Sequence, residues 1–141
     1  MRAKEYLRQL EKLDRMIENK LIERQRWLDL ATDTTAALHG ERVQSSGNKQ
    51  RMESAIVSMV DLEKEIDDCI DRLVDTRRDV VGVIEQLNAT EYDLLHKIYV
   101  QHIPIYDVAT KSDKSYSWTT TVHGRALKNV QNILDAREGE K

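Results

Sequence analysis

Two long stretches of the chain repeat apolar residues with the period of an α-helix. From Arg2 to Ala31, apolar residues recur mostly at steps of three, four or seven, and no Gly or Pro interrupts them. From Arg51 to Leu87 the steps alternate between four and three, and nine of the eleven positions on this row are apolar. The first stretch predicts an amphipathic helix, and the second predicts a long helix with coiled-coil-like packing.

The row within 51–87 predicts a dimer seam. A second row of small and apolar residues, including Ala55, Leu62 and Cys69, lies beside it and widens the buried face. One helix over 2–31 is too narrow to cover this face, so we expect two copies of the chain to pair as a homodimer. The residues assigned to the seam are Ile56, Met59, Ile66, Ile70, Leu73 and Val80.

Residues 32–50 lose the helical period and are rich in Thr, Ser, Gly and Asn. This composition predicts a long loop that joins the two helices into an antiparallel hairpin over residues 1–86. Two interpretations of the loop stay open, because long connections are either unstructured connectors or ordered contact segments.

Composition and charge support an all-α fold and narrow the classes of partner. One Pro, five Gly and no Phe favour long helices over strands and tight turns. The chain has no apolar run of membrane-spanning length and opens on charged residues, so we expect a cytoplasmic protein without a membrane partner. Residues 53–86 hold ten acidic and four basic residues, so any contact with a polyanion is expected elsewhere.

The last part of the chain, 87–141, predicts three shorter helices. Asn88 is placed to cap the first, with Glu91 completing a capping box, and Pro104 then interrupts the chain. A second helix is expected from Ile105 to Lys111, followed by a tight turn. Ser115 caps a final helix, so the layout is that of a helix-turn-helix.

Two sequence resemblances agree with this layout. The segments L-N-A-T-E-Y-D-L-L-H-K-I-Y, I-Y-D-V-A and S-Y-S-W-T-T-T-V-H-G-R-A-L resemble region 4 of bacterial primary sigma factors. With M-R-A-K-E-Y-L at the start and E-R-V-Q-S-S-G in the loop, the whole chain resembles small phage and prophage proteins of Firmicutes grouped with the autolysin regulator ArpU. Three positions depart from the sigma pattern, because Ser112, Asp113 and Thr119 stand where an apolar residue, Gly and Val are usual.

The sigma-like pattern implies a transcriptional regulator that binds double-stranded DNA. The first turns of a recognition helix reach base edges, whereas later turns and the preceding helix meet phosphates. We therefore expect base contacts from Tyr116, Ser117, Thr120 and Thr121, and phosphate contacts from Lys111, Lys114, Arg125 and Lys128. These base positions lack the Arg residues of sigma factors, so the consensus promoter hexamer is not the expected target.

The residues favour binding over catalysis. The four His have no metal-ligand spacing, Cys69 has no neighbouring His, and no Gly-rich phosphate loop exists. We therefore expect no enzyme activity, no metal and no cofactor. Trp118 is interpreted as a core residue, with stacking on bases as its alternative. The alternative function is an adaptor that contacts host RNA polymerase or another phage protein without reading DNA.

Overall fold

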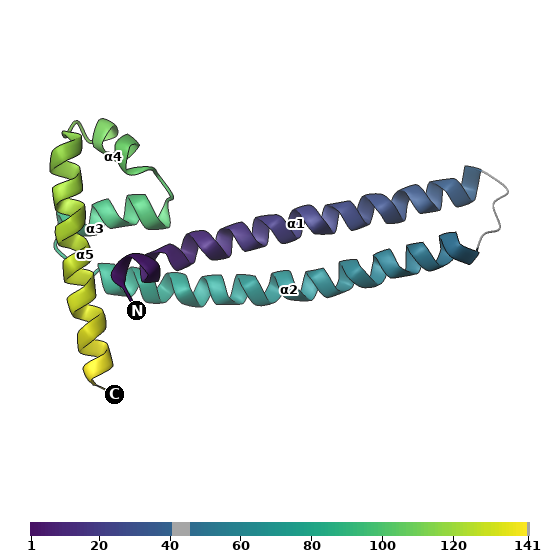
Figure 1. The fold of residues 1–141 in the computed structure, drawn as a ribbon, viewed down its shortest axis with the longest axis horizontal. Coiled ribbons are helices and arrows are strands. Elements are labelled where there is room, and N and C mark those ends of the chain that lie inside the picture. Colours follow the sequence, from purple (N-terminus) through teal and green to yellow (C-terminus); the bar gives the residue numbers. More distant parts are fainter. Residues whose placement is uncertain (41–45, 141) are drawn as a thin grey trace. The chain divides into compact units, whose positions relative to one another are not determined.

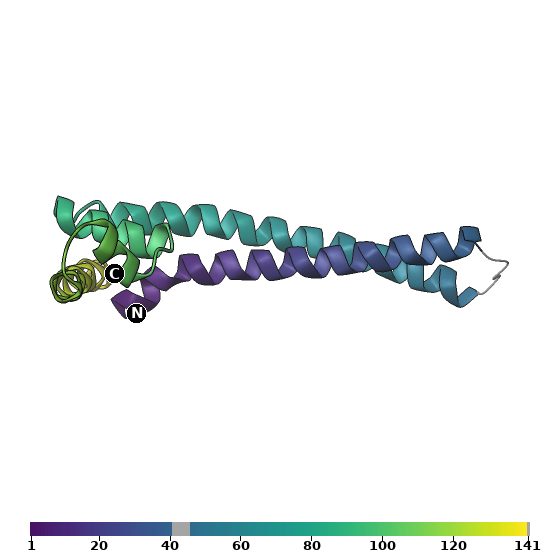
Figure 2. The same ribbon diagram turned by 90° about the horizontal axis from the view of Figure 1, so that it is seen from above.

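The computed structural model describes residues 1–40 and 46–140, and all regular structure in these ranges is helical. Helices α1 and α2 run antiparallel and side by side in both views (Figures 1 and 2), and a smaller helical region follows them. The predicted all-α fold with a long hairpin is therefore confirmed. The elements are α1 (Ala3–Gly40), α2 (Ser46–Ile84), α3 (Ala89–Leu95), a π-helical turn η1 (His96–Val100), α4 (Ile105–Lys111) and α5 (Tyr116–Gly139).

The predicted loop over 32–50 is too long, because 32–40 belong to α1 and 46–50 belong to α2. Thr, Ser and Asp cost a helix at most about 0.7 kcal/mol per residue relative to Ala, and two Ala and one Leu lie in the same tract. A helix that already has more than twenty residues therefore continues through them, since each added residue extends it without a new nucleation step. Residues 41–45 lie outside the described residues. Whether the loop is a connector or a contact segment therefore stays a prediction.

The chain divides into two compact units. Unit 1 consists of Met1–Leu13 and Leu73–Lys141, and unit 2 consists of Asp14–Arg72. This division differs from the predicted modules, a hairpin over 1–86 and a helix-turn-helix over 87–141. Dimerisation by the first and DNA binding by the second stay predictions. No helix in the described ranges is long and apolar enough to cross a membrane.

Unit 1 has a core built from both ends of the chain. Leu7 of α1, Val80 and Ile84 of α2, Leu95 of α3 and Val130 of α5 are fully buried in one cluster. Burial of each such side chain contributes about 1.5–3 kcal/mol, so this cluster is the main source of stability for the unit. It fixes α5 against the first turns of α1 and the last turns of α2.

Polar contacts surround this core. The backbone N–H of Ala3 donates to Oε1 of Gln131 at 2.8 Å. The hydroxyl of Tyr6 donates to the carboxylate of Asp79, which also accepts from Nη2 of Arg137 at 2.9 Å. These bonds join α1, α2 and α5 at the edge of the core.

The predicted seam on α2 is split between the interior and the surface. Ile66 and Val80 are buried, Met59 and Leu73 are half-buried, and their neighbours Ala55, Leu62 and Cys69 are buried with them. Ile56 and Ile70 are instead 47% and 41% exposed. The row that faces the interior is therefore shifted toward the one predicted as the flank, and the burial of Cys69 confirms its interpretation as a small core residue. Because small side chains such as Ala55 and Cys69 let two helices approach closely, we attribute the shift to them.

Salt bridges between α1 and α2 lie in unit 2 of the hairpin. Nζ of Lys20 lies 2.9 Å from Oε2 of Glu65, and Nη2 of Arg24 lies 2.9 Å from Oε1 of Glu63. Both pairs are partly exposed, and such pairs contribute about 0–1 kcal/mol each. They therefore contribute little to the stability of the hairpin.

Candidate nucleic-acid interface

The turn between α4 and α5 is fixed by its own backbone. Asp113 has a φ of 55°, the left-handed conformation that Asp tolerates better than most residues. The N–H of Lys114 donates to the carbonyl of Ala109 at 3.1 Å, and that of Ser112 to the carbonyl of Val108 at 3.0 Å. Asp113 thus replaces the usual Gly without loss of the turn.

The start of α5 follows the prediction. Ser115 is the N-cap, and its hydroxyl accepts from the N–H of Trp118 at 3.0 Å. Thr119 is fully buried, and its hydroxyl donates to the carbonyl of Ser115 at 2.9 Å. Because the hydroxyl has this partner, Thr119 fills the position of the usual Val without an unsatisfied polar group.

One face of α5 is exposed and carries small and polar residues, which we call the outer row: Ser117, Thr121, Gly124 and Lys128. Successive members are four, three and four residues apart, so they lie on the face opposite the buried Val122 and Ala126. The hydroxyl of Thr121 donates to the carbonyl of Ser117 at 2.9 Å.

Three of the four predicted base-contacting residues lie at the exposed surface of the first two turns of α5. Ser117 and Thr121 belong to the outer row, Tyr116 is exposed beside it, and Thr120 is half-buried. Tyr116 also packs against the ring of Tyr106 from α4, with ring centroids 6.2 Å apart. Gly124 was not among the residues predicted for this surface. Its spacing of three residues from Thr121 and four from Lys128 in the predicted helix was the signal that could have placed it there.

The four predicted phosphate-contacting residues fall into two groups. Lys111, Lys114 and Lys128 are exposed at the end of α4, in the turn and on the outer row. Arg125 instead lies on the flank of α5 and donates from Nε to Oε1 of Glu91 at 3.2 Å. Its guanidinium is therefore partly occupied within the protein.

The predicted capping box is only half formed, because Asn88 caps α3 but the side chain of Glu91 binds elsewhere. The side chain of Asn88 accepts from the N–H of Glu91 at 2.9 Å, which confirms the cap. Glu91 is 1% exposed, and its carboxylate accepts from Nε of Arg125 at 3.2 Å. Nδ2 of Asn129 donates to both carboxylate oxygens, at 3.1 Å to Oε1 and 3.0 Å to Oε2. The carboxylate links α3 to α5 instead of closing the first turn of its own helix.

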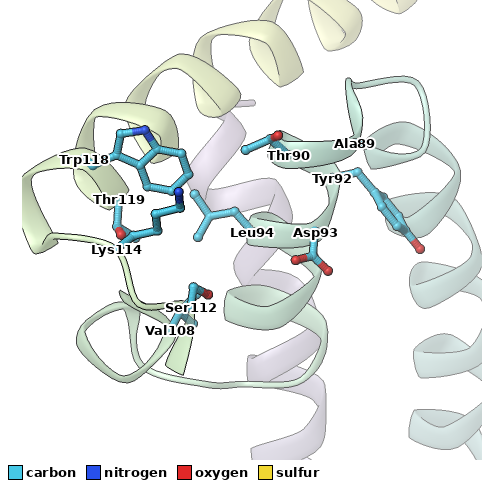
Figure 3. A pocket seen from close by; sticks show the side chains of 10 residues that line it. All are labelled: Ala89, Thr90, Tyr92, Asp93, Leu94, Val108, Ser112, Lys114, Trp118 and Thr119. Atoms are coloured by element: carbon cyan, nitrogen blue, oxygen red, sulfur yellow. The ribbon is translucent and has the colours of Figure 1, made fainter. Parts of the chain in front are cut away.

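A hollow of about 630 Å³ lies beside the start of α5 (Figure 3). Its walls include Thr90 and Leu94 of α3, Val108 of α4, and Lys114 and Trp118. Nζ of Lys114 lies 5.2 Å from the centroid of the Trp118 ring, and Figure 3 shows the two side chains beside each other. Trp118 is 41% exposed, so its interpretation as a core residue is wrong.

The His residues do not converge on a metal site in the described ranges, where no group of three or more His, Cys, Asp or Glu is placed to hold an ion. His123 accepts from or donates to the hydroxyl of Tyr99 at 2.8 Å, and the two rings stack with centroids 5.8 Å apart. Burial, together with the charges of Lys4 and Arg8, lowers the pKa of His123.

Comparison of the chain with known protein families, with curated proteins and with solved structures finds no match.

Proposed function

We propose that the chain is a phage- or prophage-encoded transcriptional regulator that binds double-stranded DNA through a helix-turn-helix formed by α4 and α5. The observation that carries this proposal is the outer row of α5, which is exposed and follows directly on a rigid turn. Ser117, Thr121 and Gly124 are short, so the helix backbone can approach a groove closely. The resemblance to sigma region 4 agrees with this assignment, which also places the protein in the cytoplasm.

Base recognition in this proposal uses short hydroxyl side chains. Thr121 and Thr120 offer a methyl group to thymine. Their hydroxyls donate to the carbonyl of Ser117, so their oxygens are available to accept from a donor on a base edge. Tyr116 lies at the start of α5 and packs against Tyr106 of α4. In this proposal its hydroxyl reaches either a base or the DNA backbone. Such a surface favours A·T-rich sequences, because it can contact thymine methyl groups but has no Arg to bind guanine.

Phosphate contacts come from three lysines at the edge of this surface. Lys111 and Lys114 precede the recognition helix, and Lys128 follows its base-reading turns. Arg125 reaches phosphate in this proposal through N–H groups other than Nε, which is held by Glu91. The binding energy from three or four such contacts depends strongly on salt.

We further infer that two copies pair through the exposed flank of α2. Ile56, Val60 and Ile70 are exposed on this flank in unit 2, and Leu21 of α1 borders the same hollow as Glu63 and Asp67. Apolar side chains on one face of a helix surface are typical of a self-pairing helix. A dimer would present two helix-turn-helix modules to a symmetric site on DNA.

The adaptor function remains the second candidate because of the hollow beside Trp118. Trp118, Leu94 and Val108 form an apolar wall next to Lys114, which suits an apolar side chain of a partner such as host RNA polymerase. In that case α5 would bind protein rather than DNA.

Selection of bound sequences from a random duplex library by the full-length protein tests the proposal. We expect enrichment of one motif, with wild-type binding that weakens steeply as salt increases. Replacement of Thr121 by Val should change the enriched motif, whereas Trp118→Ala should leave it unchanged. No enrichment, together with capture of RNA polymerase that Trp118→Ala abolishes, would support the adaptor function instead.

A further inference from the structure

A second hollow in unit 1 lies away from the outer row and has a volume of about 300 Å³. Lys4, Arg8 and Glu11 of α1 line one side, and Tyr99 and His123 line another. Ile98, His102 and three apolar residues of the segment that enters α4 complete it. Since all these residues belong to unit 1, the hollow lies within one compact body.

The hollow has a positive lining. Lys4 and Arg8 are exposed and four residues apart, so they lie on the same face of α1. Glu11 supplies a negative charge beside them, which leaves one fixed positive charge in excess. His123 adds an imidazole, which can become positive when an anion binds.

His123 has a defined position in this lining. Its Nε2 lies 2.8 Å from the Tyr99 hydroxyl, and Tyr99 belongs to the buried core of the unit. Lys4 and Arg8 line the same hollow as His123, and after burial, the larger cause, their charges lower the pKa of His123. An anion between them would cancel this effect and favour the protonated ring.

We propose that this hollow binds a phosphate group through Lys4, Arg8 and His123. A phosphate group carries up to two negative charges and three acceptor oxygens, which matches two cations and a titratable ring better than a carboxylate does. The group has two sources, a free phosphorylated small molecule or the backbone of a DNA duplex. The second source rests on the proposed function, whereas the first does not.

Titration of the His123 imidazole by NMR in the full chain tests this proposal. One arm adds inorganic phosphate, and the other adds a duplex enriched by the selection described above or, failing enrichment, a random duplex. We expect inorganic phosphate to shift the His123 resonances and to raise the pKa of His123. Arg8→Gln and Lys4→Gln should each weaken phosphate binding by about tenfold, the loss of one charge-assisted hydrogen bond.

Lys12→Gln is the matched control, because Lys12 is exposed on the same helix but does not line the hollow. It should bind phosphate as the wild type does. Phosphate binding by Arg8→Gln and Lys4→Gln at wild-type strength would overturn the proposal, as would unchanged His123 resonances in both arms.

The two arms also separate the sources and the two proposals. If Arg8→Gln weakens binding to the duplex as well, the site takes a backbone phosphate. If duplex binding is unchanged, or absent in the wild type, while phosphate binding is lost in Arg8→Gln, the site takes a free phosphorylated molecule. If the wild type does not bind the duplex but Arg8→Gln loses phosphate binding, the proposed DNA-binding function is wrong and the proposed phosphate site is supported.

Discussion

Arg125 and Glu91 form a pair in which an exposed guanidinium binds a carboxylate that is fully buried. The side chain of Arg125 is 58% exposed, that of Glu91 is 1% exposed, and 3.2 Å separates Nε from Oε1. Asn129 donates to the same carboxylate from the next turn of α5. This buried carboxylate therefore adds polar contacts to the apolar packing that holds α5 beside α3.

Replacement of Glu91 by Ala should lower the free energy of unfolding by about 2–3 kcal/mol, since charge-assisted hydrogen bonds are lost and Asn129 is left without its partner. Urea unfolding followed by circular dichroism measures this. Asp93→Ala is the control on the same helix. Asp93 is exposed and pairs with Lys97 four residues on, so we expect a loss of at most about 0.5 kcal/mol. Equal losses in the two variants would contradict the structural role of Glu91.

Gly124→Ala separates the stability of α5 from its approach to DNA. A Cβ at Gly124 meets no atom within 4 Å, so the substitution should stabilise the protein by about 0.5–1 kcal/mol, the cost of Gly in a helix. If the outer row enters a groove, the added methyl group should weaken DNA binding.

Gly82→Ala on α2 is the matched control for Gly124→Ala. Gly82 is exposed and also has open space around it, so its substitution should stabilise the protein equally and leave DNA binding unchanged. Thermal unfolding and a DNA titration of both variants check this. Tighter or unchanged DNA binding by Gly124→Ala would argue against a groove contact at this residue.

The exposed and buried parts of α2 should respond differently to charge. Ile70→Glu should shift the molecular mass measured by light scattering from dimer to monomer and leave the helical content intact. Ile66→Glu should unfold the hairpin, because an unpaired charge in a buried position is costly. A monomeric wild type at micromolar concentration would contradict the proposed pairing.

Lys128→Ala should weaken binding to all DNA sequences and reduce the slope of log affinity against log salt by about one. Thr121→Val should instead change the preference among sequences by about 1–3 kcal/mol at one position. Lys64→Ala, on the acidic hairpin, is expected to leave both properties unchanged. A reduced slope in Lys64→Ala would place the phosphate contacts on α2 instead.

Acid should weaken unit 1 through Asp79. Burial alone would raise the pKa of Asp79, but hydrogen bonds from Tyr6 and Arg137 and the charge of Arg137 lower it overall. The carboxylate therefore stabilises the fold above its unfolded pKa of about 3.9 and loses this effect as pH falls through the folded pKa. Acid titration of wild type, Tyr6→Phe and Asp79→Asn should show a graded loss of this dependence, and three identical titrations would contradict it.

Local signals in the sequence predicted much of the C-terminal region. Asn88 and Ser115 are N-caps, and the interruption at Pro104 and the turn at Asp113 were also expected. These features depend on a few neighbouring residues, whose backbone preferences are strong.

Features that depend on tertiary packing could not be predicted in the same way. Ile66 and Ile70 both belong to rows with four-three spacing, and the partner helix decides which of them is buried. Glu91 fits a capping box, yet two side chains from α5 bind it instead. Trp118 is apolar enough for a core, but the position of α3 leaves it at the rim of a hollow. The same holds for the candidate site. Its residues were predicted from the sequence, but the hydrogen bond between Arg125 and Glu91 was not, because it depends on how α3 packs against α5.

The first turns of α1 are synthesised early but complete their contacts late. Ala3 bonds to a residue 128 positions further along the chain, and Leu7 is buried against α2 and α5. During translation, Ala3 therefore stays without Gln131, and Leu7 without the part of its packing that α5 supplies, until α5 has left the ribosome. Contacts of such high sequence separation slow folding, because the intervening chain must close before they form. We expect the hairpin contacts of unit 2 to form first and α5 to seal unit 1 as the last step.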